Sequence, residues 1–151
     1  MKSENRRIKQ RLSLLLVLIA LFTMVAPSVS ATNIEPRASY YLTSYACCLV
    51  ENSSGGITAS YSVVGTGTMS SIGVTTAYIQ KKSGASWVTI KTLTSGSNPS
   101  FLATNTFTHS GDIRYSEVAS NSTYRVKITV YASNASGSDS RTVTSNTLTI
   151  T

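Results

Sequence analysis

The chain is poor in the residues from which metal centres and catalytic sites are usually built. Its 151 residues include one histidine, two cysteines, one tryptophan and six acidic residues. A structural zinc site takes four ligands, usually in separated pairs, whereas Cys47 and Cys48 are adjacent and have one histidine to complement them. The composition therefore predicts a protein without a metal centre or cofactor.

Charged residues are also scarce, at 13% against 41% hydrophobic residues, which excludes a disordered polyelectrolyte. The formal charge of +7 is concentrated near the start: residues 1–31 carry five basic groups and one acid, and the remaining residues carry eight basic and five acidic groups. No block of five like charges occurs after residue 31. Without a basic stripe to contact phosphates, we expect no nucleic-acid partner.

Only one long apolar run is present, over residues 12–26, and it follows a basic segment. The run is shorter than the ~20 residues that a membrane span needs. A basic flank, a short apolar run and small residues are typical of a signal peptide, here a helix within residues 1–31, with cleavage between Ala31 and Thr32. We expect a secreted protein with no membrane span after cleavage; an uncleaved anchor is the alternative.

After a short leader at residues 32–38, helix formers are rare and no period of 3.6 residues is evident. Val, Ile, Thr and Tyr dominate, and apolar residues alternate with polar ones, as in half-buried strands. The pattern predicts an all-β fold over residues 39–151, a single antiparallel β-sandwich of about seven strands. The expected strands are residues 39–50, 57–63, 72–82, 86–94, 101–109, 124–132 and 141–151.

Segments rich in Gly, Ser and Asn predict the turns. The expected turns are residues 52–56, 65–67, 83–85, 95–99, 110–112 and 134–138. In the last expected strand the apolar residues change from odd-numbered to even-numbered positions: Val143 is at an odd position, whereas Leu148 and Ile150 are at even positions. A β-bulge near Ser145 would explain this change.

Cys47 and Cys48 fall within the first expected strand, where neighbouring side chains point to opposite faces. One interpretation is a buried thiol beside a surface thiol. A possible disulfide is the other: either an intermolecular bridge, favoured by export to oxidising surroundings, or a vicinal bridge in a strained turn. The sequence leaves these alternatives open.

His109, Ser110 and Asp112 supply the residue types of a hydrolytic triad. Triad members must converge in space, and residues so close together in one loop do not readily do so, so we expect an exposed turn. Asp112 and Asp139 are too isolated to predict a calcium site, since no acidic cluster accompanies them. We therefore expect no enzymatic activity and no catalytic residues.

Eight tyrosines and the single tryptophan lie after residue 38. Alternation places Tyr131 on the outer face beside Lys127 and Arg125. Exposed aromatic rings can stack on sugars or anchor a protein interface, so Tyr131 and Trp87 are the candidate binding residues. The alternative is that most of these rings pack within the sheets.

Residues 123–138 resemble the penultimate strand and following turn of fibronectin type III and immunoglobulin-like domains. Tyr124 stands where those domains place the tyrosine of a tyrosine corner, whose hydroxyl bonds to upstream backbone. The resemblance implies a sandwich fold and a structural role for Tyr124.

The whole chain also resembles an uncharacterised family of short secreted proteins of Gram-positive bacteria, through residues 34–41, 72–73, 87–91, 109–115 and 137–141. This resemblance implies export and a small β domain. The expected function is an extracellular or cell-surface binding module for a cell-wall polysaccharide or an extracellular protein. The alternative is a soluble toxin-like or signalling factor that acts on a protein partner.

Overall fold

A computed structural model of the chain describes residues 39–151. The expected signal peptide, the cleavage site at Ala31 and Thr32, and the leader at residues 32–38 lie outside the described residues. Every described residue belongs to one compact unit.

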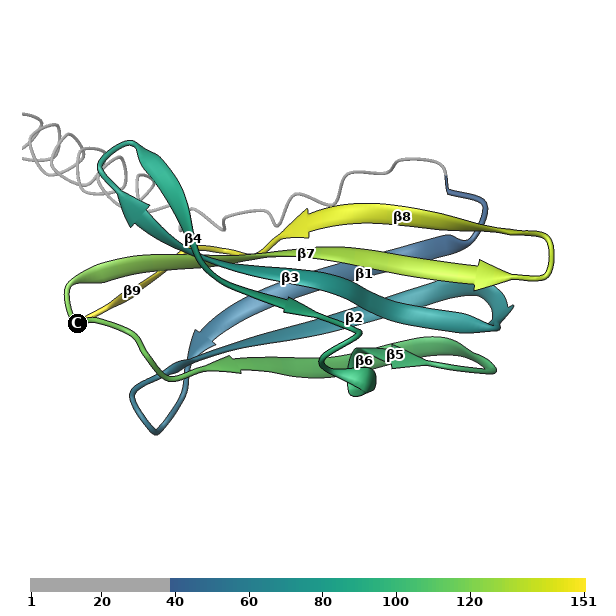
Figure 1. Cartoon of the computed structure of the whole chain (residues 1–151), viewed down its shortest axis with the longest axis horizontal. Coiled ribbons are helices and arrows are strands. Elements are labelled where there is room, and N and C mark those ends of the chain that lie inside the picture. Colours follow the sequence, from purple (N-terminus) through teal and green to yellow (C-terminus); the bar gives the residue numbers. More distant parts are fainter. Residues whose placement is uncertain (1–38) are drawn as a thin grey trace, which may run out of the picture. The chain divides into compact units, whose positions relative to one another are not determined.

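The described chain is almost entirely β-structure, as the sequence predicted, and forms two antiparallel sheets that pack together (Figure 1). Its one helical element is the short 3-10 helix η1 (Pro99–Phe101), so no helix within residues 39–151 is long and apolar enough to cross a membrane. The strands are β1 (Leu42–Glu51), β2 (Ile57–Met69), β3 (Ser71–Ser83), β4 (Ser86–Thr94), β5 (Leu102–Ala103), β6 (Thr106–Tyr115), β7 (Ser122–Asn134), β8 (Gly137–Thr144) and β9 (Leu148–Ile150).

One sheet has the order β1-β2-β6, and the other has the order β4-β3-β7-β8, with β5 paired to β3 and β9 paired to β7. Because β7 occupies one edge of β3, β4 and β5 share the other edge. In the same way β8 and β9 share the free edge of β7. The nine strands thus fill three positions in one sheet and four in the other, which reconciles them with the seven strands expected.

Strand β7 has one apolar face, which is buried between the two sheets. Tyr124, Val126, Ile128, Val130 and Ala132 are each at most 1% exposed and face the core between the sheets. The intervening side chains face outward and are half-buried. The alternation read from the sequence is therefore confirmed, and burial of this apolar row is the main force that holds β7 in place.

Two expected turns, residues 65–67 and 110–112, are wrong, because the structure places them inside β2 and β6. Residues 110–112 pair with residues 60–62 of β2, so their backbone groups are used within the sheet. Gly65 pairs with Leu42 of β1, and the pairing of β2 with β6 is interrupted between Val64 and Met69. The glycine at 111 serves close packing instead: a Cβ there would stand 2.7 Å from the Tyr61 hydroxyl oxygen. The strand expected over residues 101–109 is also shifted, since η1 and β5 precede β6.

The expected bulge near Ser145 is present. Lys127 pairs with Thr144 and Tyr124 pairs with Leu148, so two residues of β7 face three residues of the β8–β9 connection. Ser145 is buried at the bulge: its amide donates to the Val126 carbonyl at 2.8 Å, and its hydroxyl accepts from the Val126 amide at 2.9 Å. The extra residue explains the change of apolar parity.

Asn146, which follows the bulge, covers part of the edge of β1. The Leu49 amide donates to Asn146 Oδ1 at 2.7 Å, and Asn146 Nδ2 donates to the Leu49 carbonyl at 2.9 Å. The side-chain amide thus takes the place of a neighbouring strand at an edge whose backbone groups would otherwise be open to another chain. It also ties the two sheets together.

Candidate functional site

The outer face of the sheet that contains β3, β4, β7 and β8 gathers aromatic and basic side chains. Residues directly opposite each other in antiparallel strands share a face, and Arg125 pairs with Gln80, Lys127 with Tyr78, and Trp87 with Lys82. We call this set the basic–aromatic face. It is defined by Tyr78, Gln80, Lys82, Trp87, Thr89, Arg125, Lys127 and Tyr131.

Tyr131 and Trp87, the two candidate binding residues, are thus brought to the same face of one sheet. Tyr131 lies on β7 and Trp87 on β4, and both are half-buried. Tyr78 lies between them on β3 and is also half-buried. Each ring therefore packs on the sheet with one part and meets solvent with the rest, as binding aromatics do.

The three rings form a diagonal row across the sheet. Tyr78 stands four residues from Lys82, the partner of Trp87, and Tyr131 stands four residues from Lys127, the partner of Tyr78. At about 3.3 Å per residue, successive rings lie roughly 13 Å apart along the strands. Such a row suits an extended polymer, because a single small molecule would not span it.

A network of polar contacts positions the end of the row. The Arg125 guanidinium lies over the Trp87 ring, with its carbon 4.3 Å from the ring centroid. Arg125 Nε donates to Gln80 Oε1 at 2.8 Å, and Gln80 Nε2 donates to Thr89 Oγ1 at 3.1 Å. The arginine thus reaches from β7 across β3 to β4. A cation–π contact and two hydrogen bonds hold these side chains in place before any partner arrives.

The basic–aromatic face is positively charged. Lys82, Arg125 and Lys127 lie on it. The carboxylates within residues 39–151 lie elsewhere: the first is on β1, the second on β6, the third in the β6–β7 connection, and the fourth on β8, opposite the buried Ala132. Those carboxylates are Glu51, Asp112, Glu117 and Asp139.

The outer face of the three-stranded sheet is different in kind. Its cross-strand pairs join small residues, such as Ala46 with Ser62, Cys48 with Ser60, and Ser62 with Ser110. Over these paired positions the described strands present no aromatic ring. This surface is the natural control for experiments on the basic–aromatic face.

The three residues with triad chemistry lie on β6, and the exposed turn expected for them is wrong. Ser110 donates to the Ser62 hydroxyl at 3.2 Å, and Asp112 accepts from the Ser60 hydroxyl at 2.7 Å, both on the outer face. His109 lies on the other side, with Nε2 2.9 Å from the Ser100 carbonyl oxygen. Strand alternation separates the histidine from its would-be partners, so no triad is assembled.

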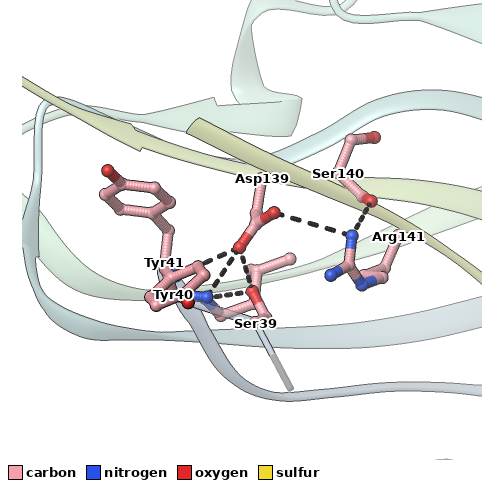
Figure 2. Close-up of polar contacts among 7 residues, drawn as sticks. Ser39, Tyr40, Tyr41, Asp139, Ser140 and Arg141 are labelled. Atoms are coloured by element: carbon pink, nitrogen blue, oxygen red, sulfur yellow. Dashed lines mark hydrogen bonds and ion pairs between the residues drawn. The ribbon is translucent and has the colours of Figure 1, made fainter. Parts of the chain in front are cut away.

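Asp139 is surrounded by hydrogen-bond donors (Figure 2). One of its carboxylate oxygens accepts from the Ser39 hydroxyl and from the amides of Tyr40 and Tyr41, at 2.8 and 3.2 Å for the amides. The other lies 3.6 Å from Arg141 Nη1. These contacts, the Ser39 hydrogen bond foremost, lower the pKa of Asp139.

This environment gives Asp139 a structural role. It ties residues 39–41, where the described chain begins, to β8. Donors and an arginine would compete with a cation, and no group of three potential metal ligands occurs within residues 39–151. Asp112 lies in the other sheet, so the two carboxylates do not come together.

Cys47 and Cys48 are both free thiols on a regular stretch of β1. Cys47 is half-buried against the core, and Cys48 is exposed on the opposite face. Burial, together with the neighbouring Cys48, raises the pKa of Cys47 to about 12. This arrangement is the buried-and-surface pair; a vicinal bridge would require the strand to distort, and an intermolecular bridge through Cys48 stays a prediction.

We expect the two thiols to differ sharply in reactivity. With a pKa of about 12, Cys47 is thiolate in only about one molecule in ten thousand at pH 8, and the thiolate is the nucleophile. A chromogenic disulfide reagent should therefore titrate one thiol rapidly in the native protein and two in denaturant. The Cys48→Ser variant should lose the fast phase. Two equally fast native thiols would show that Cys47 is not packed against the core.

Tyr124 makes the contact that a tyrosine corner requires. Its ring is buried in the core, and its hydroxyl accepts a hydrogen bond from the Ala119 amide at 2.8 Å. Ala119 lies five residues upstream, in the connection from β6 to β7. The side chain therefore fastens that connection to the start of β7.

The sequence did not single out Tyr78, Gln80 or Lys82. Their signal was the alternation through residues 76–82, but assigning them to the same surface as Trp87 and Tyr131 requires the register of three strands. Comparison with known proteins found no matching family model, curated protein or solved structure.

Proposed function

We propose that this protein is a secreted, non-enzymatic binding module that engages a cell-wall polysaccharide through the basic–aromatic face. The observation that carries the proposal is the row of half-buried rings of Trp87, Tyr78 and Tyr131 on one sheet face, with Arg125 fixed over the first. Aromatic rings offer flat apolar surfaces on which sugar rings stack. The surrounding threonine and glutamine side chains offer hydrogen bonds to sugar hydroxyls.

We assign the domain to the fibronectin type III and immunoglobulin-like sandwiches. Two observations support this assignment. First, β8 and β9 share one edge position of the sheet, and when they are counted as one strand, β7 is the penultimate strand of the chain. Second, the Tyr124 hydroxyl, near the start of β7, accepts a hydrogen bond from upstream backbone.

Export and the absence of catalysis are parts of the same proposal. Export is supported by the basic and apolar pattern of residues 1–31, which is typical of a signal peptide. A binding role is favoured over catalysis because His109 is separated from Ser110 and Asp112 by strand alternation.

A second candidate function is a soluble extracellular factor that acts on a protein partner. The observation that favours it is the edge strand β4, where Val88 and Ile90 are 50% and 38% exposed. An open edge with exposed β-branched residues can accept a strand from another protein. In Figure 1 the end of the β3–β4 hairpin bends away from the other strands, which leaves this edge accessible.

The test is co-sedimentation of residues 32–151, which include the core residues of the described sandwich, with isolated Gram-positive cell wall. We expect the wild-type protein to pellet with the wall and to be released by soluble wall sugars. Trp87→Ala, and Tyr78→Ala combined with Tyr131→Ala, should each weaken binding about tenfold or more, as loss of a binding anchor worth about 2 kcal/mol does.

The matched control is Ser62→Ala combined with Ser110→Ala on the opposite sheet, which should pellet like the wild type. Circular dichroism would verify that each variant is folded. A wild-type protein that stays in the supernatant would contradict the proposal and favour the soluble factor. Equal pelleting of all variants would show that another surface binds the wall.

A further inference from the structure

Within residues 39–151, the cations of the basic–aromatic face differ from the other arginines in having no acidic partner. Arg114 lies 3.5 Å from Asp112, and Arg141 lies 3.6 Å from Asp139, so each of these two arginines has a carboxylate partner. No carboxylate of the described chain forms an ion pair with a cation of the basic–aromatic face. Lys82, Arg125 and Lys127 therefore leave uncompensated positive charge on the surface that carries the aromatic row. Lys81 and Lys91 also form no ion pair within residues 39–151, but their strand partners, the buried Tyr124 and Ile79, place them on the other face of the sheet.

Two rings of the row have a cation directly opposite them on the neighbouring strand. Lys82 is the cross-strand partner of Trp87, and Lys127 is the partner of Tyr78. Lys127 also shares its strand face with Tyr131, four residues away. Rings and cations thus alternate along the diagonal, an arrangement that fits a polymer in which sugar rings and negative groups alternate.

The Arg125 guanidinium is oriented to receive an oxyanion. Its carbon lies over the Trp87 ring, and its Nε donates to Gln80, so the N–H groups of the terminal nitrogens are not used by these two contacts. The terminal nitrogens form the planar fork that matches the two oxygens of a carboxylate. The contacts that hold the guanidinium therefore leave its anion-binding end for a partner.

We infer that the polysaccharide bound by the basic–aromatic face is acidic, with a carboxylate on its repeating sugars. This inference rests on the proposed function and names its ligand class. Charge complementarity supports it: a neutral glycan would use the rings and hydroxyls but would leave three cations of one sign unmatched. An acidic glycan would satisfy them while its sugar rings stack on the aromatic row.

The test uses Trp87 as a reporter, because it is the single tryptophan of the chain and lies on the face in question. Residues 32–151 are titrated with polygalacturonate and with its fully methyl-esterified form, and Trp87 fluorescence is followed at low and physiological salt. We expect polygalacturonate to bind at least tenfold more tightly than the ester, and to weaken as salt is added.

Two variants locate the effect. Lys127→Gln should weaken polygalacturonate binding about two- to fivefold, the range of one exposed ion pair. Arg114→Gln, which removes a cation from the opposite sheet, should leave the affinity unchanged. Equal losses in both variants would point to net charge instead of the face and would overturn the inference.

The outcomes separate the inference from the proposed function. Pelleting with wall but equal affinity for polygalacturonate and its ester, or no binding to either, would overturn the acidic ligand and leave the wall module standing. Tighter binding to single-stranded oligothymidine than to polygalacturonate at the same salt would overturn it in favour of a nucleic acid. Failure to bind wall and both glycans would overturn inference and proposed function together.

Discussion

Gly73→Ala is expected to destabilise the sandwich by about 3 kcal/mol or more, the combined cost of backbone strain and overpacking. Gly73 lies in β3 with φ of 146°, a conformation that side chains disfavour. A Cβ there would stand 2.0 Å from the Phe101 carbonyl oxygen and 2.8 Å from His109 Cδ2. Because the first of these atoms is backbone, either η1 or β3 would have to move. The free energy of unfolding, measured by urea denaturation, would report the loss.

Gly67→Ala is the matched control, because Gly67 also lies within a strand but a Cβ added there would have no atom within 4 Å. Its stability should stay within about 1 kcal/mol of the wild type, since Gly→Ala also lowers the entropy of the unfolded chain. If Gly73→Ala were as stable as Gly67→Ala, the segment from η1 into β5 would not lie against β3 as described.

Tyr124→Ala is expected to lower the free energy of unfolding by about 3–5 kcal/mol, as large-to-small changes of buried aromatic residues do. The ring is 1% exposed and lies in the core row of β7. Domains of this size are stable by only about 5–15 kcal/mol, so the loss would be a large fraction of the total stability. Equilibrium denaturation followed by circular dichroism would measure the loss.

Tyr124→Phe separates the hydroxyl from the ring. It removes only the hydrogen bond from the Ala119 amide, and because Ala119 is exposed, water can replace the lost partner. We expect a cost of about 1 kcal/mol. A loss as large as that of Tyr124→Ala would show that the corner contact, and not core packing, dominates; no loss at all would show that the contact does not stabilise the domain.

Much of the fold could be read from the sequence because strand burial leaves a period of two. The alternation from Tyr124 to Ala132 predicted β7 and its buried face, and the parity change between Val143 and Leu148 predicted the bulge. Both features depend on neighbouring residues of one segment. Such local patterns are visible without knowledge of which strands pair.

The errors arose where a residue's role depends on a distant partner. Gly111 and its neighbours have residue types common in turns, but they lie in a strand because residues 110–112 pair with residues 60–62. The glycine leaves space for the Tyr61 side chain, since a Cβ there would stand 2.7 Å from its hydroxyl oxygen. Asn146 could be placed near a bulge, yet its bonds to Leu49 join segments almost a hundred residues apart. Tertiary contacts of this kind leave no periodic trace in the sequence.

Only part of the candidate site could be predicted, because its other residues are brought together by contacts between distant strands. Trp87 and Tyr131 were singled out as aromatic residues in expected strands, without any indication that they share a surface. The register of β4, β3 and β7 places them together and adds Tyr78 between them. Arg125 was expected to face outward, but its stack on Trp87 depends on its reach across β3.

The measurement that most directly tests the basic–aromatic face as the binding surface is a nuclear magnetic resonance titration of isotope-labelled residues 32–151 with soluble cell-wall fragments. We expect amide shifts to change in β3, β4 and β7, with the largest changes around Tyr78, Trp87 and Tyr131, and the Trp87 indole signal to move. Resonances of β1, β2 and β6 should stay in place. Shifts confined to the three-stranded sheet, or to the β4 edge at Val88 and Ile90 alone, would contradict the account.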